Sequence, residues 1–347
     1  MATRFWRGAP GDSWNGTAGS KWSATKLGAT GASEPTSTDD VIFDELSGSS
    51  VVPILNNRDA GTLNCTGFTG TIGDGTSGGG PDPYALILPY GDVTLSSGMS
   101  LNKVGFVFEL FGVSAAYTCA GIASSHIHIA GTGASTFTLV DNLITDSFEA
   151  AKTNVTVVTN NHSIATQSFR NSLSGASNQF GSSQLTLTGS GANLFVVAGV
   201  TGASTVVFTS TAAAANSISA TGTLHKIEIT GANAAADWTI NGGAALAVDV
   251  LSAVPGNNAI SGDITVATGA GVQIDGTPLL EQKLGNLRLR VTTGRPNIYY
   301  AYVANCTVTG ARGVVYNGTS VGINTNLVFS YPDPNTNGLF IGTDNVS

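Results

Sequence analysis

Residues 126–140 read HIHIAGTGASTFTLV, and this stretch decides the fold class. Hydrophobic and polar residues alternate on both sides of a glycine-containing segment at 131–133. Alternation places one set of side chains on each face of a β-strand, and glycine supplies the positive φ angle that a tight corner needs. The stretch therefore predicts two short strands joined by a sharp turn.

The same strand-and-turn pattern recurs along the chain. Further alternating runs lie at 104–110, 155–158, 184–188, 206–209, 225–230 and 262–266. Their outward positions hold mostly Thr, Ser, Asn and Gln, which stack coil on coil without the repulsion that like charges would cause. We therefore expect an all-β chain whose body is a parallel β-solenoid, a β-helix-like stack of short coils. Tandem β-sandwich domains are the alternative.

Composition divides the chain into four predicted parts. The parts are an aromatic N-terminal docking or capping segment at 1–70, a Gly/Pro-rich loop at 71–90, the solenoid body at 91–280 and a C-terminal β cap at 281–347. Distinct ends are expected because a solenoid must cover the unpaired edges of its first and last coils.

Charge and hydropathy exclude several classes of partner. The 347 residues include 14 Lys and Arg against 22 Asp and Glu, for a formal net charge of −8. The densest basic stretch, 283–290, has the pattern of a single strand and not that of a phosphate-binding loop, so we expect no nucleic-acid partner. No apolar run approaches the about 20 residues that a membrane span needs, so we expect no membrane partner. The first residues lack the apolar core of a signal peptide, which predicts synthesis in a host cytoplasm.

Histidines and cysteines give little sign of a metal site. His126 and His128 share the outward face of one predicted strand, which is half of a metal site, but no nearby carboxylate is evident. We expect a solvent-facing pair. Cys65, Cys119 and Cys306 are far apart, form no CxxC motif and are expected to be small apolar fillers in strands.

Two groups of carboxylates are candidates for glycan hydrolysis or for calcium binding. Asp237 beside Trp238 is the best sugar-binding pair, because an aromatic ring and a carboxylate together can hold a pyranose. Asp39 and Asp40 offer a possible calcium site. Most other aspartates flank turns, where they hydrogen-bond the backbone. The prediction is therefore of a protein that is not an enzyme, with no catalytic residues, no metal and no cofactor.

Aromatic residues mark both ends of the chain. Residues 1–45 contain three of the four tryptophans, and these form either a packed cap or a docking surface, since aromatic side chains anchor interfaces. Tyrosine and arginine become frequent from residue 279 onward. The candidate partner-docking residues are Phe5, Trp6, Trp14, Trp22, Tyr299, Tyr300 and Tyr302.

The N-terminal segment resembles the opening of a group of tailed-bacteriophage virion structural proteins, with decoration and fibre-like members. The resemblance rests on 4–8 (RFWRG), Trp14, 21–23 (KWS), 35–44 (PTSTDDVIFD) and 65–70 (CTGFTG). It covers the first 70 of 347 residues, and it departs at Arg7 and Ala9, where that pattern has Val and Gly.

This resemblance implies a non-enzymatic component of a phage virion. The most specific expectation is a capsid decoration or cement protein that binds the major capsid protein or other virion proteins, as a homo-oligomer and most simply a homotrimer. A tail fibre or tailspike that recognises host glycan is the alternative. A bacterial surface adhesin is a third possibility, disfavoured by the missing signal peptide.

Overall fold

Nearly every regular element that the structure describes is a β-strand; the exception is one 3-10 turn at Gly269–Gly271. The computed structural model covers residues 1–347 and describes 1–14, 20–49, 51–54, 57–73, 85–102, 106–131, 133–191, 193–209, 216–230, 237–243, 245–253, 259–278, 282–331 and 340–342. No helix in these ranges is long and apolar enough to cross a membrane.

The predicted all-β parallel β-solenoid is confirmed. Among the strand pairs whose register the structure describes, the antiparallel ones are β1 (Thr3–Trp6) with β2 (Trp22–Ser23) and β34 (Leu327–Tyr331) with β35 (Phe340–Gly342). The other register pairs run parallel, as in stacked coils. The alternative of tandem β-sandwiches is therefore wrong, because sandwich sheets pair their strands antiparallel.

The chain forms two compact units. Unit 1 comprises Met1–Thr166 and Leu173–Gln179, and unit 2 comprises Gln167–Ser172 and Phe180–Ser347. The predicted solenoid body at 91–280 therefore contributes strands to both units.

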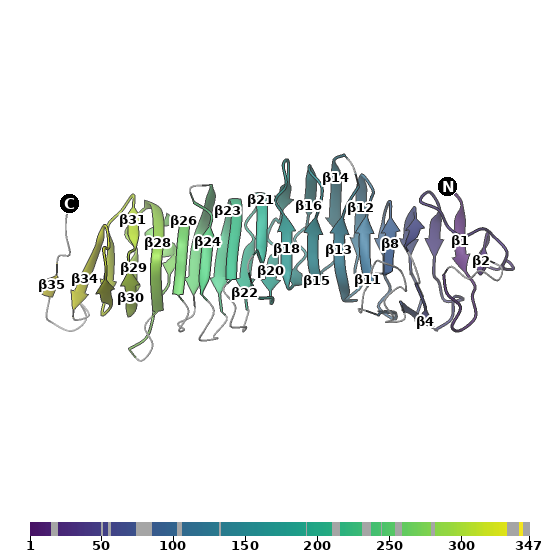
Figure 1. Ribbon diagram of the computed structural model, residues 1–347, viewed down its shortest axis with the longest axis horizontal. Coiled ribbons are helices and arrows are strands. Elements are labelled where there is room, and N and C mark those ends of the chain that lie inside the picture. Colours follow the sequence, from purple (N-terminus) through teal and green to yellow (C-terminus); the bar gives the residue numbers. More distant parts are fainter. Residues whose placement is uncertain are drawn as a thin grey trace. The chain divides into compact units, whose positions relative to one another are not determined.

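Unit 1 stacks its strands in three parallel rows (Figure 1). The first row is β1, β3 (Asp40–Ile42), β6 (Thr62–Asn64), β9 (Val93–Thr94), β12 (Ser114–Thr118), β14 (Ser135–Leu139), β16 (Val155–Val158) and β19 (Ser177–Gln179). The second row is β5 (Arg58–Ala60), β8 (Ala85–Pro89), β11 (Phe106–Leu110), β13 (Ser124–Ile129), β15 (Leu143–Ala150) and β17 (Ile164–Thr166). The third row is β4 (Val51–Val52), β7 (Thr71–Ile72) and β10 (Ser100–Leu101).

Alternation decides which side chains of unit 1 enter the core. In β14, Phe137 and Leu139 are buried while Thr136 and Thr138 face outward. The register places Phe137 between Ala115 of the preceding coil and Val157 of the next. Inward aromatic side chains pack on one another along the unit, with centroid separations of 5.9, 5.8 and 5.3 Å through Phe108, Tyr117, Phe137 and Phe148. These separations lie in the range of favourable aromatic pairs.

Coil length varies while strand pairing continues. Val41 pairs with Leu63, 22 positions later, but Leu63 pairs with Val93, 30 positions later. The longer coil contains the predicted loop at 71–90, of which 74–84 lie outside the described residues. Strands β7 and β8 occupy parts of that range, and parallel pairing begins at Thr3, so the stacked rows extend into both the predicted loop and the predicted N-terminal segment.

Polar side chains at the corners join neighbouring coils. The Asp141 carboxylate accepts hydrogen bonds from the backbone N–H groups of Cys119 (2.7 Å) and Ala120 (2.6 Å) in the preceding coil. Ala120 needs this support because its φ of 52° lies in the left-handed region, which an alanine seldom adopts. The turn aspartate therefore has a structural role, as the sequence indicated.

Unit 2 is built in the same way, with longer strands that bend across two rows. One row is β18 (Ser168–Asn171), β21 (Phe195–Thr201), β23 (Asn216–Ile229), β24 (Trp238–Asn241), β26 (Ala259–Thr268), β28 (Gln282–Thr293), β30 (Ala301–Ala304) and β33 (Thr319–Val321). A second contains β20 (Gln184–Leu187), β22 (Thr205–Phe208), the end of β23, β25 (Leu246–Ala253) and β27 (Val272–Gln273). The end of β28 pairs with β31 (Thr307–Thr309), and β29 (Asn297–Tyr299), β32 (Gly313–Tyr316) and β34 form a further row.

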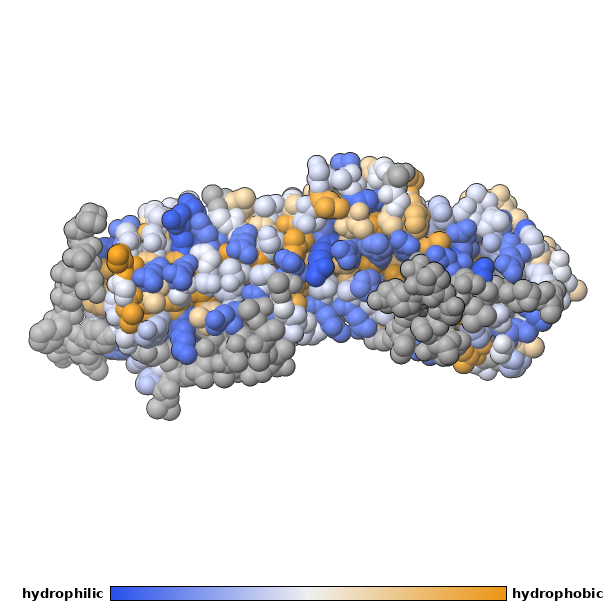
Figure 2. Space-filling model, viewed as in Figure 1, coloured by the Kyte–Doolittle hydropathy of each residue, from blue (hydrophilic) through white to orange (hydrophobic). Residues whose placement is uncertain are grey.

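The core of unit 2 repeats the aromatic stacking. Phe169, Phe195, Phe208 and Trp238 follow one another with centroid separations of 6.3, 6.1 and 5.2 Å. On the face in view in Figure 2, hydrophilic and weakly polar residues cover most of the described surface of each unit. Uncharged polar side chains on the outward faces are what the strand pattern predicted.

Candidate functional site

The N-terminal tryptophans lie in the core of unit 1. Trp6, Trp14 and Trp22 have exposed fractions of 1%, 1% and 0%. Antiparallel pairing of β1 with β2 sets Trp6 opposite Trp22, with their ring centroids 5.1 Å apart, and Phe43 packs against all three rings. This corrects the prediction of docking for these tryptophans: buried rings are not available to a partner, and the alternative of a packed cap describes them.

Phe5 is the one predicted N-terminal docking residue that keeps surface access. It alternates with buried Trp6 on β1 and is half-buried. The guanidinium carbon of Arg7 lies 5.3 Å from the centroid of its ring, within cation–π range. Phe5 and Arg7 therefore form a small surface group beside the buried cluster.

Arg7, which departs from the resembled pattern, closes the cap. Its Nη1 and Nη2 atoms donate to the two carboxylate oxygens of Asp44 at 2.8 and 2.9 Å, and Nη1 also donates to Ser47. Burial alone would raise the pKa of Asp44, but hydrogen bonds and the charge of Arg7 lower it below its usual value. The pair joins the end of β1 to the turn at 44–47.

Two leucines beside this pair are exposed, and no pattern in the sequence distinguishes them. Leu27 is 88% exposed and Leu46 is 47% exposed. Their chain neighbours Lys26 and Glu45 form an ion pair of 2.7 Å, which brings the two turns together. We call Lys26, Leu27, Glu45 and Leu46 the N-terminal patch. It combines apolar side chains with a charged pair at the surface, as protein interfaces do.

The C-terminal tyrosines are all partly exposed. Tyr299 stacks on Tyr316 of the next coil, with centroids 4.9 Å apart and ring planes at 17°. Tyr300 lies at the following corner with a φ of 49°, and Tyr302 faces outward on β30. The structure thus brings Tyr299 together with Tyr316. Tyr316 is distant from Tyr299 in the sequence and was not among the predicted docking residues.

The histidines of β13 face outward, as predicted, and they alternate with the buried Ile127 and Ile129. His128 has a carboxylate partner that the sequence did not reveal: its Nδ1 lies 3.2 Å from Oε1 of Glu109 on β11. Register pairing extends this row to Glu149. Within the described residues, no group of three or more His, Cys, Asp or Glu is arranged to hold a metal ion.

The sugar-binding pair proposed from sequence does not exist. Trp238 is fully buried and packs on Phe208 in the core, so it offers no face to a sugar, while neighbouring Asp237 is exposed. Asp237 instead accepts a hydrogen bond from the backbone N–H of Ala259. Its role is that of a corner residue.

The remaining candidates are structural. The carboxylate of Asp39 accepts hydrogen bonds from Ala2 and from the backbone and hydroxyl of Thr36, which leaves a poor calcium site. Cys65, Cys119 and Cys306 are buried, as expected, and burial raises the pKa of each thiol, which makes a nucleophilic thiolate unfavourable.

Comparison with protein-family models, with curated proteins and with solved structures found no match to this chain.

Proposed function

We propose that this protein is a non-enzymatic structural component of a tailed-bacteriophage virion, most specifically a decoration or cement protein of the capsid. The observation that carries the proposal is the N-terminal cap. The residues of the resembled pattern are not scattered: Trp6, Trp14, Trp22 and Phe43 pack in one cluster, and Asp44 of the same pattern holds Arg7. Because the residues of the resembled pattern form one folded cap, we infer that this cap has the same role here as in the virion proteins that the pattern resembles.

The N-terminal patch is the proposed contact with the major capsid protein or another virion protein. Leu27 and Leu46 offer apolar surface in a segment whose tryptophan side chains are buried. The outward rows of Thr, Ser and Asn suit a body that projects or packs against identical copies without charge repulsion. A homotrimer is the proposed assembly.

Two measurements test the proposal. Mass spectrometry and immunogold labelling of purified particles of the encoding phage should detect the chain at many copies on the head. The protein added to particles that lack it should bind, and Leu27→Ser with Leu46→Ser should weaken binding by about tenfold or more, because a buried leucine contributes about 1.5–3 kcal/mol.

Ile323→Ser is the matched control, since Ile323 is 81% exposed in unit 2. It should leave particle binding unchanged. Absence of the chain from purified particles would refute the virion role. Equal binding by the double leucine variant and the unmodified protein would refute the assigned docking surface.

The alternative of a tail fibre or tailspike is favoured by one observation, the partly exposed stack of Tyr299 on Tyr316. Exposed aromatic faces are common platforms for sugar rings. Labelling confined to the tail of the particle would favour this alternative, and release of oligosaccharides from host polysaccharide would show that the protein cleaves the glycan.

A further inference from the structure

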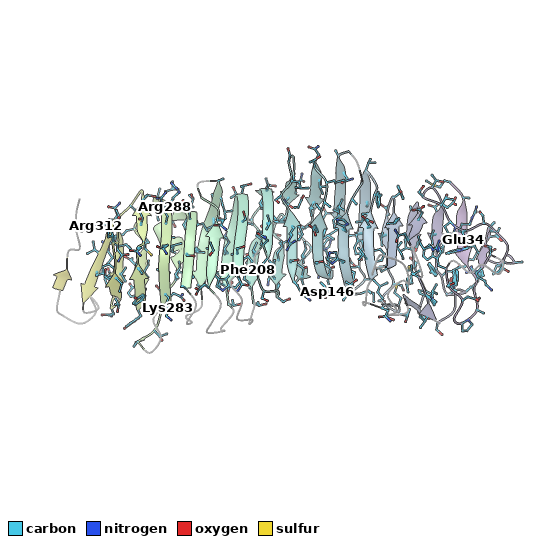
Figure 3. All side chains as sticks on the ribbon, viewed as in Figure 1. Glu34, Asp146, Phe208, Lys283, Arg288 and Arg312 are labelled. Atoms are coloured by element: carbon cyan, nitrogen blue, oxygen red, sulfur yellow. The ribbon has the colours of Figure 1, made fainter. Side chains whose placement is uncertain are left out.

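Positive charge is concentrated at one end of unit 2. Residues 282–331, all described, contain Lys283 and four arginines but no Asp or Glu, in a chain whose net charge is −8. Arg288 and Arg290 lie on β28, Arg295 in the turn that follows, and Arg312 in the turn after β31. We call these four the arginine patch. Figure 3 places Arg288 and Arg312 along one edge of unit 2 and Lys283 along the opposite edge.

Coil stacking brings the four arginines to one side. Arg288 and Arg290 pair in register with Thr307 and Thr309 of the next coil, and those threonines lead into the turn of Arg312. The backbone N–H of Val314 donates to Pro296, so the turns that hold Arg295 and Arg312 lie on adjacent coils. Adjacent coils are about 4.8 Å apart, which sets the spacing of the guanidinium groups along the row.

One carboxylate is joined to this patch by the described ion pairs. Asp263 accepts hydrogen bonds from Nε (3.0 Å) and Nη2 (2.8 Å) of Arg290 and lies 3.9 Å from Arg288. Arg288 remains 52% exposed, and Arg295 and Arg312 are exposed. Asp263 thus orients Arg290 while most of the positive charge stays at the surface.

The chemistry of the patch selects its partner. Guanidinium groups bind carboxylate, sulfate and phosphate through paired hydrogen bonds, which favours a partner with repeated oxyanions. Besides Asp263, which pairs with Arg288, the outward register neighbours are the hydroxyl-bearing Thr265, Thr307 and Thr309, not the apolar anchors that organise protein interfaces. Duplex DNA carries about one charge per 1.7 Å, so the acidic remainder of the chain would repel it more strongly than a polysaccharide whose charges are spaced more widely.

We propose that the arginine patch binds an anionic polysaccharide, an extended glycan whose sugar units carry carboxylate or sulfate groups. The polymer lies along the coils, its oxyanions meet the guanidinium groups and its hydroxyls meet the threonines. The isolated chain should bind such a polysaccharide by itself, whether or not the protein is a virion component.

The test is direct binding of the purified full chain to polygalacturonate and dextran sulfate, with neutral dextran as the uncharged probe, by titration calorimetry. We expect both polyanions to bind, dextran not to bind, and affinity to fall as salt rises. The triple variant Arg288→Gln, Arg295→Gln, Arg312→Gln should lose about a hundredfold in affinity, at roughly fivefold per exposed charge pair.

Two further variants sharpen the result. Lys21→Gln, Arg170→Gln, Lys226→Gln removes the same net charge elsewhere and should bind nearly as the unmodified chain does. Asp263→Asn removes the one carboxylate and should tighten binding, an outcome that misfolding cannot mimic. The proposal is overturned if neither polyanion binds, if both triple variants weaken binding equally, or if duplex DNA binds more tightly than polygalacturonate.

Discussion

Replacing Trp22 by alanine tests whether the aromatic cluster is the structural cap that the packing indicates. Trp22 is fully buried, and its ring lies 5.1, 5.1 and 5.7 Å from those of Trp6, Trp14 and Phe43. Truncating a buried Trp to Ala typically costs about 3–5 kcal/mol through lost burial and the cavity that remains. Aromatic pairs add about 0.5–1.5 kcal/mol each, so we expect the upper part of that range.

The assay is hydrogen exchange read by mass spectrometry, because a stacked-coil protein can open locally without unfolding throughout. In Trp22→Ala, exchange in β1, β2 and β3 should accelerate by about a hundredfold or more, while exchange in the aromatic core of unit 2 stays unchanged. Trp22→Phe should give a smaller effect. Leu27→Ala, at a residue that is 88% exposed, is the control and should change little. If Trp22→Ala exchanged no faster than Leu27→Ala, the cap interpretation would be refuted.

Two more predictions follow from the backbone and from charge. Gly262 has a φ of 109°, and a Cβ there would lie 2.0 Å from the carbonyl oxygen of Ile240, so Gly262→Ala should lower the thermal unfolding temperature sharply or prevent folding. Gly285→Ala, where a Cβ meets nothing within 4 Å, should fold with an almost unchanged unfolding temperature. Because the pKa of Asp44 is lowered, its contribution to stability is present above the ordinary Asp pKa of about 3.9 and is lost as pH falls through its folded-state pKa. Asp44→Asn should therefore be less stable than the unmodified protein by about 1–3 kcal/mol at pH 7 in urea titrations, with the difference shrinking toward pH 2; a constant difference would show that the charge is not responsible.

The fold was predictable because its signal is local. Each strand carries its own alternation, and Phe137 or Ile127 can be assigned to the core from its two neighbours alone. The glycine and asparagine corners are equally local, since a positive φ is a property of one residue. A parallel stack could then be inferred from the scarcity of charge on the outward positions.

Contacts between coils were not predictable, because they depend on register. His128 meets Glu109 across 19 positions, and Arg290 meets Asp263 across 27. Coil length changes along the chain, so no fixed offset identifies such partners in advance. The tryptophans show a second limit of prediction from sequence. Their position near the terminus was compatible with a docking surface or with a cap, and only their burial in the structure distinguishes the two.

The unequal coils have a consequence for how this protein can change. The coil between Leu63 and Val93 is eight positions longer than the one before it, yet the strands on either side pair as usual. Single corners can therefore gain or lose residues. Selection for the buried side chains does not oppose such changes, because the strands that carry those side chains stay paired. Sequences of this architecture should therefore change in coil length as well as in composition. The strands then lose their regular spacing along the sequence although the stacked fold is retained. The same tolerance makes the long coil a natural place to graft a foreign peptide for display.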